Sequence, residues 1–146
     1  MDGISEILAT YNCVSLDEKI QFELDGVVEK EIKQAYCIEN LEFCVSCMDY
    51  TTLKVSDTEE SVKNFTADLL KKLKKFNLRD VAAVCVFSNY AGIVREGLKG
   101  TEIQTAVVAG NFPNSQTFTE IKLAECKMAI GAGAQEVDVV ISVGDI

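Results

Sequence analysis

The sequence has 146 residues, of which 48% are hydrophobic and 25% are charged. These proportions are typical of a soluble globular domain and exclude a disordered chain. The formal net charge is −9, so the sequence lacks the basic face that nucleic-acid binding needs. No apolar run approaches the roughly 20 residues of a membrane span, and the N-terminus lacks a signal-peptide pattern. We therefore expect a cytoplasmic protein that binds neither nucleic acid nor membrane.

The predicted elements alternate between strands and helices after a helical beginning. Residues 1–42 are mostly polar and form a predicted helical N-terminal extension. Short runs rich in apolar and β-branched residues then predict four strands, at 43–50, 81–87, 104–109 and 136–143. Between them we predict helices at 62–76 (after N-cap residues at 56–59) and at 89–98, and a third helix that a capping sequence at 117–120 begins and that runs to about 131.

This β-α-β-α-β-α-β order predicts a parallel sheet with right-handed crossovers. The strand at 81–87 (VAAVCVF) is apolar almost throughout, as expected for a strand buried on both faces. Two architectures fit the order: an open doubly wound sheet and part of a (β/α)₈ barrel. No G-x-G-x-x-G follows the first strand, which weakens the case for a dinucleotide-binding fold.

The sequence has no histidine, which excludes Ser-His-Asp and Cys-His catalysis. It has six cysteines, which are expected to be reduced thiols in the cytosol. Cys44 and Cys47 form a C-x-x-C motif, but no second such motif or histidine is present to complete a zinc site. In a strand their sulfur atoms would point to opposite faces. We therefore interpret the motif as a coincidence and expect no metal site.

Two carboxylates interrupt the predicted strands. Asp138 lies inside an apolar run, where an unpaired buried carboxylate would cost several kcal/mol. Because strand side chains alternate, Glu136, Asp138, Val140 and Ser142 share one face, which we expect to line a barrel interior or a cleft. Asp49 interrupts the first predicted strand in the same way.

If the polar faces all turn inward, Asp49, Cys85 and Asp138 converge. Like charges brought close raise one carboxyl pKa, which suits proton transfer. Two alternatives remain open: each aspartate can instead cap a neighbouring loop, and Cys85 can be a small buried hydrophobic residue. Residues 111–115 hold the only proline of the chain and form a predicted βα loop, of the kind that builds active sites at the C-terminal face of a barrel.

Five segments together resemble deoxyribose-phosphate aldolase. They occur in the order and at the spacing of that family, between Phe43 and Ile146, and the ordered set is specific although each motif alone is modest evidence. The segments are MDYTTLK (48–54), DTEE (57–60), AAVCV (82–86), NFP (111–113) and GAQEVDVV (133–140).

The resemblance implies a class I aldolase that cleaves 2-deoxy-D-ribose 5-phosphate to glyceraldehyde 3-phosphate and acetaldehyde, without a metal or other cofactor. In such an enzyme a lysine amine forms a Schiff base with the substrate and acts as an electron sink. By the resemblance, Asp138 is the proton-relay aspartate and Asp49 is a supporting acid or base. Thr51 lies near the substrate, and Cys85 lines the pocket.

The resemblance also implies that the Schiff-base lysine is absent from this chain, because the family carries it on the sixth strand. Every lysine here falls in a predicted helix, loop or cap. A full barrel usually needs about 250 residues. We therefore expect residues 43–146 to be the truncated first half of a (β/α)₈ barrel, inactive alone, with a homo-oligomer or a complementary C-terminal half as partner. The alternatives are a non-catalytic half-barrel and a cysteine-based redox or metal module.

Overall fold

A computed structural model describes residues 10 and 13–145 of the chain. The chain divides into two compact units, Met1–Leu41 and Glu42–Ile146. Among the described residues, no helix is both long enough and apolar enough to cross a membrane.

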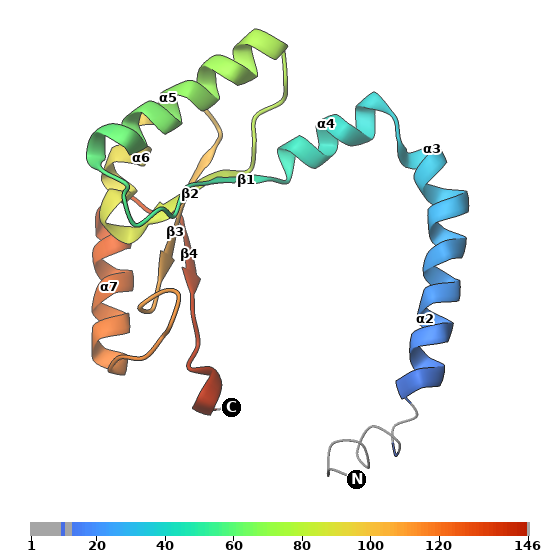
Figure 1. Cartoon of the computed structure of the whole chain (residues 1–146). Helices are drawn as coiled ribbons and strands as arrows, with labels where there is room; N and C mark the ends of the chain where they lie inside the picture. The colour runs from blue at the N-terminus through green and yellow to red at the C-terminus, as the bar shows by residue number, and fades with distance from the viewer. Residues whose placement is uncertain (1–9, 11–12, 146) are drawn as a thin grey trace. The chain divides into compact units, whose positions relative to one another are not determined.

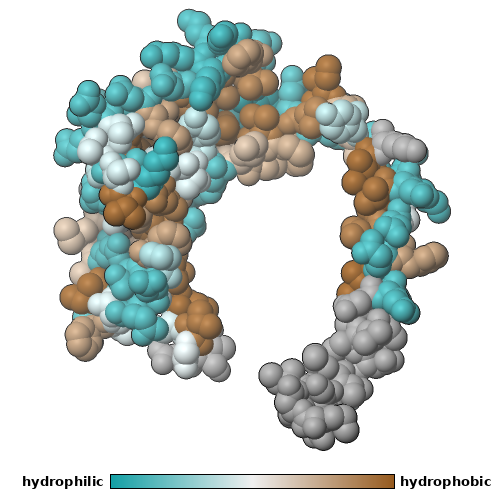
Figure 2. Space-filling model, viewed as in Figure 1, coloured by the Kyte–Doolittle hydropathy of each residue, from teal (hydrophilic) through white to brown (hydrophobic). Residues whose placement is uncertain are grey.

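The described residues of the first unit are mostly helical. It contains α2 (Cys13–Val27), a π-helical segment η1 (Val28–Ile32) and α3 (Lys33–Ala35), and α4 (Ile38–Ser46) begins within it and ends in the second unit. Apolar side chains gather along one side of α2 (Figure 2), and Ile20, Phe22 and Leu24 of this helix are at least half exposed.

The second unit is built on a four-stranded parallel sheet (Figure 1). The strands are β1 (Asp49–Thr51), β2 (Ala83–Phe87), β3 (Gln104–Ala109) and β4 (Glu136–Val139). The helices that connect them are α5 (Glu59–Phe76), α6 (Ala91–Gly97) and α7 (Thr119–Gly131), with short 3₁₀ segments η2 (Ser88–Tyr90) and η3 (Val143–Asp145).

The strand order decides between the two predicted architectures. The sheet runs β1-β2-β3-β4, with every neighbouring pair parallel. A doubly wound sheet reverses its order at a switch point, whereas here each strand is added on the same side of the last. Same-handed crossovers in that order place all the connecting helices on one face of the sheet, as in a (β/α)₈ barrel.

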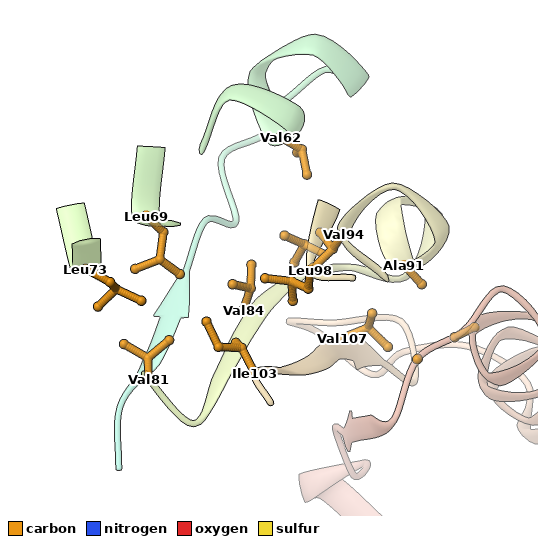
Figure 3. Packing of buried hydrophobic residues seen from close by; sticks show 13 residues of the cluster. Val62, Leu69, Leu73, Val81, Val84, Ala91, Val94, Leu98, Ile103 and Val107 are labelled. Carbon is orange, nitrogen blue, oxygen red and sulfur yellow. The ribbon is translucent and has the colours of Figure 1, made fainter. Parts of the chain in front are cut away.

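The main core lies between this face and the helices. Val62, Leu69 and Leu73 of α5 point toward Val84 of β2 (Figure 3). Further buried members come from α6, the loop after it, β3 and α7, and they are Val94, Leu98, Ile103, Val107 and Ala129. A separate small cluster on the opposite face of the sheet is formed by Ala83, Cys85, Ala106 and Val108.

The helix α5 has the clearest local signals in the sequence. Its N-cap is Thr58, whose hydroxyl accepts a hydrogen bond from the Ser61 backbone N–H, while the Ser61 hydroxyl accepts one from the Thr58 backbone N–H. Glu59 and Glu60 in the first turn suit the positive end of the helix dipole. At the C-terminal end, Asn77 adopts a left-handed conformation with φ of 51° and ends the helix.

Three predicted boundaries are wrong. Residues 43–46 belong to α4 and not to a strand, because a short apolar run fits either period and here continues a helix from Ile38. The fourth strand ends at Val139 and not at 143, because its partner β3 ends at Ala109 and Gly110 turns away with φ of 79°. The helix α7 begins at Thr119 with Phe118 as N-cap and without a side-chain cap, so the predicted capping of this helix by residues 117–120 is wrong.

Candidate functional site

The sheet register places the predicted site residues on one face. Thr51 is paired with Cys85, and Cys85 with Ala106. One row further along, toward the C-terminal ends of the strands, Val108 is paired with Asp138. Asp49 is two residues before Thr51 and therefore shares its face. These positions alternate with the side chains of the main core, as the sequence predicted for Asp49, Cys85 and Asp138.

All four predicted residues line the same open pocket of about 520 Å³. Asp49 and Thr51 come from β1, Cys85 from β2 and Asp138 from β4. The wall between them is completed by apolar residues, which are Leu53, Val108, Phe112, Val137, Val139 and Val140. The two aspartates are exposed to this opening, whereas Cys85 is only 4% exposed. The pocket therefore combines two solvated carboxylates with one buried thiol.

The burial and the charges of the pocket together shift the pKa of the Cys85 thiol. The pKa of this thiol is raised from about 9 to about 11, first by burial and then by the negative charges of Asp138, Asp49 and Glu136. A side-chain hydrogen bond with Thr51 acts in the opposite direction. A thiol with so high a pKa is protonated at neutral pH and is a poor nucleophile. Cys85 therefore fits a wall residue better than a catalytic nucleophile.

Glu136 contributes to the negative potential at Cys85, although it is not among the residues that line the pocket. Strand alternation predicted that it shares a face with Asp138, but not its effect on this thiol. One lining residue was not predicted from the sequence. Phe112 lines the pocket from the loop after β3. The predicted loop at 111–115 contains Phe112, but the sequence does not predict how this loop folds and therefore does not place Phe112 in the same pocket as Asp138. No lysine lines this pocket in the described part of the chain.

The C-x-x-C motif lies elsewhere in the fold. Cys44 is in the last turn of α4 and Cys47 follows the helix, so the prediction that both lie in a strand is wrong. Both are exposed free thiols. A reactive C-x-x-C gains its thiolate from the positive N-terminal end of a helix, whereas this motif lies at the negative end. Among the described residues, no group of three or more His, Cys, Asp or Glu side chains could hold a metal ion.

Comparison with known proteins identifies relatives of this chain. No family model matches it. It is 44% identical over 97 residues to a deoxyribose-phosphate aldolase of Clostridium novyi, and 41% identical over 97 residues to one of Clostridium tetani. Each match covers 66% of this chain and 40% or 41% of the relative. The chain is a homologue of deoxyribose-phosphate aldolases.

The solved structures of these aldolases agree with the fold. The tetrameric deoxyribose-phosphate aldolase of Aeropyrum pernix aligns with a TM-score of 0.57 and 27% sequence identity, over 70% of this chain and 41% of that one. The predicted partial (β/α)₈ barrel is therefore confirmed. The chain spans about 40% of the length of the aldolase relatives that it matches.

Proposed function

We propose that this chain supplies part of the active site of an aldolase that cleaves 2-deoxy-D-ribose 5-phosphate to glyceraldehyde 3-phosphate and acetaldehyde. The observation that carries the proposal is the convergence of Asp49 and Asp138 on one pocket in a chain homologous to deoxyribose-phosphate aldolases. Carbon–carbon cleavage through a Schiff base needs proton transfers at the reacting atoms, and positioned carboxylates perform them.

In this proposal Asp138 relays protons and Asp49 supports it. Asp138 lies near the C-terminal end of β4, the end of the strands at which (β/α)₈ barrels place their catalytic groups. Thr51 and Cys85 contact the substrate. Since no lysine of the described residues lines the pocket, we propose that the Schiff-base lysine is supplied by strands other than these four. The four strands are then inactive alone, and a complementary half-barrel supplies the lysine. An oligomer, as in the tetrameric Aeropyrum pernix relative, would repeat these four strands and is proposed only as a quaternary state.

A chimera tests this proposal. Residues 43–146 replace the matching part of the Clostridium novyi aldolase, which provides the remaining strands. We expect the chimera to cleave deoxyribose 5-phosphate and to be trapped covalently by borohydride in the presence of substrate, whereas the isolated chain forms no adduct. Asp138→Asn should lower the turnover of the chimera by about 10²–10⁴-fold.

The matched control is Asp80→Asn, which changes an exposed aspartate outside the pocket and should leave turnover unchanged. A folded chimera that does not cleave the substrate would support the alternative of a non-catalytic half-barrel. An Asp138→Asn chimera with full turnover would remove Asp138 from the mechanism.

A further inference from the structure

Two charged residues of α7 face the C-terminal ends of the strands and not the solvent. Lys122 and Glu125 are three positions apart, which places them on the same side of the helix, and both are partly buried. They have opposite charges, yet no ion pair joins them in the described part of the chain. Instead, each side chain makes hydrogen bonds to neutral groups of other segments.

Glu125 links the ends of β2 and β3. Its Oε1 accepts a hydrogen bond of 2.9 Å from the hydroxyl of Ser88, the residue that follows β2. Its Oε2 accepts bonds of 2.9 and 3.0 Å from the backbone N–H groups of Gly110 and Asn111, which follow β3. Gly110 and Asn111 both have positive φ, of 79° and 62°, so this carboxylate holds the turn at which the chain leaves the sheet.

Lys122 links the loop after β3 to the segment after β4. Its Nζ donates hydrogen bonds to the hydroxyls of Ser115, at 2.6 Å, and Ser142, at 2.7 Å. Ser115 is 1% exposed, and its own hydroxyl donates to the Val140 carbonyl at 2.8 Å. Hydrogen bonds that involve a charged group are about twice as strong as neutral ones. The ammonium therefore fastens the end of the fourth strand to the loop of the third.

These segments build the wall of the candidate pocket. Phe112 lies in the loop between Asn111 and Ser115, and both Phe112 and Val140 line the pocket beside Asp138. A Cβ added at Gly110 would lie 2.9 Å from the Val140 carbonyl oxygen, which shows how closely the loop packs on the end of β4. Neither Lys122 nor Glu125 lines the pocket, so any effect on it must pass through the segments that they hold.

We propose that Glu125 and Lys122 are positioning residues of the candidate active site, which together hold the ends of β2, β3 and β4 around Asp138. The inference rests on the proposed function only in taking this pocket as the active site. The inference itself concerns how the loop after β3 and the pocket wall are held in place. This can be tested on the full chain without measuring catalysis.

The experiment compares five variants on α7. Glu125→Met and Lys122→Met remove the hydrogen bonds and keep unbranched side chains. Glu120→Met and Lys127→Met are the matched controls, because these residues are exposed on the same helix and lie outside the hydrogen bonds described above. Glu125→Gln is the conservative variant, since its amide oxygen can still accept from backbone N–H groups. Circular dichroism verifies that each variant is folded.

The readout is alkylation of Cys85 by iodoacetamide as a function of pH, resolved by peptide mass spectrometry. Cys85 lies in the pocket wall beside Phe112, and neither Lys122 nor Glu125 is among the groups that shift its titration. We expect both Met variants to admit water and move the Cys85 pKa from about 11 toward 9. A decrease of one unit raises alkylation at pH 8 about tenfold, because the thiolate is the reactive form. Glu125→Gln should recover most of the original profile.

The proposal is overturned if both Met variants are folded and give the Cys85 profile of the two controls. If either Met variant does not fold, Ser88→Ala and Ser142→Ala decide the question. Ser88→Ala removes only the hydrogen bond to Glu125, and Ser142→Ala removes the hydrogen bond from Lys122 together with the one that Ser142 donates to the Ser115 carbonyl. Faster alkylation in these variants supports the proposal, and an unchanged profile in both overturns it. An inactive chimera would contradict the proposed function and leave the Cys85 result intact, so the two failures can be told apart.

Discussion

Cys85 is the residue through which the chemistry of the pocket can be measured. It is buried, whereas the two aspartates beside it are exposed, so its thiol responds both to the water content of the pocket and to the charges around it. Asp138 contributes more to its raised pKa than Asp49 does, and Glu136 contributes least of the three carboxylates. The three carboxylates therefore affect the Cys85 thiol to different extents.

Neutralising Asp138 should therefore lower the pKa of Cys85. We expect Asp138→Asn to lower it further than Asp49→Asn, because the charge of Asp138 has the larger effect on the thiol. The measurement is the pH dependence of Cys85 alkylation, with Asp80→Asn as the exposed control. A larger decrease in Asp49→Asn, or equal profiles in all three variants, would contradict the arrangement of the pocket.

The raised pKa of Cys85 also links stability to pH. Between pH 9 and pH 11 the folded chain keeps a thiol proton that the unfolded chain has lost, so the stabilising contribution is fully present below about pH 9 and is lost as the pH rises through 11. The linked free energy is at most ~3 kcal/mol. We expect the stability difference between the natural chain and Cys85→Ala to decrease by up to this amount in urea titrations from pH 8 to 11. The other titrating groups cancel in this comparison, and a constant difference would exclude the linkage.

At the scale of elements, α5 depends on its N-terminal cap. Thr58→Ala removes the hydroxyl that accepts the hydrogen bond from the Ser61 backbone N–H and should lower the free energy of unfolding by about 1 kcal/mol. Urea denaturation measures the change. Ser56→Ala, an exposed serine just before the cap, should change stability by less than about 0.5 kcal/mol. Equal effects of the two substitutions would show that the cap does not stabilise the helix.

The elements also show what the sequence could and could not predict. The helix α5 and the strands β2 and β3 were predictable because long periodic or wholly apolar runs allow one interpretation. The convergence of Asp49, Cys85 and Asp138 followed from strand alternation once a parallel sheet was assumed. The helical start of the run at 43–50 was not predictable, because that run is short. Nor were the contacts of Lys122 and Glu125, because they depend on how the loop after β3 folds onto β4.

For the whole molecule, the two outer strands of the described sheet are open to pairing. β1 and β4 each have one strand neighbour, and unpaired strand edges promote association. Ile141, two residues beyond the end of β4, is 60% exposed. We expect Ile141→Lys to shift the chain toward monomer in sedimentation velocity experiments, because a charged side chain next to the edge opposes pairing. Val55→Lys, at a fully exposed valine away from this edge, is the control, and an equal shift in both would indicate a general effect of charge.

The stability of the whole chain should reside in the second unit. Every described side chain from 18 to 32 is exposed, whereas all buried members of the core clusters lie between Val62 and Ala134. A shortened chain that begins at Ile38, and so keeps α4 entire, should therefore have the urea midpoint and slope of the full chain, because the slope follows the surface exposed on unfolding. Leu98→Ala, at a core residue that is 1% exposed, should cost about 2–5 kcal/mol in both chains. A lower midpoint in the shortened chain would show that residues before 38 stabilise the half-barrel, and unequal costs of Leu98→Ala would show that they couple to its core.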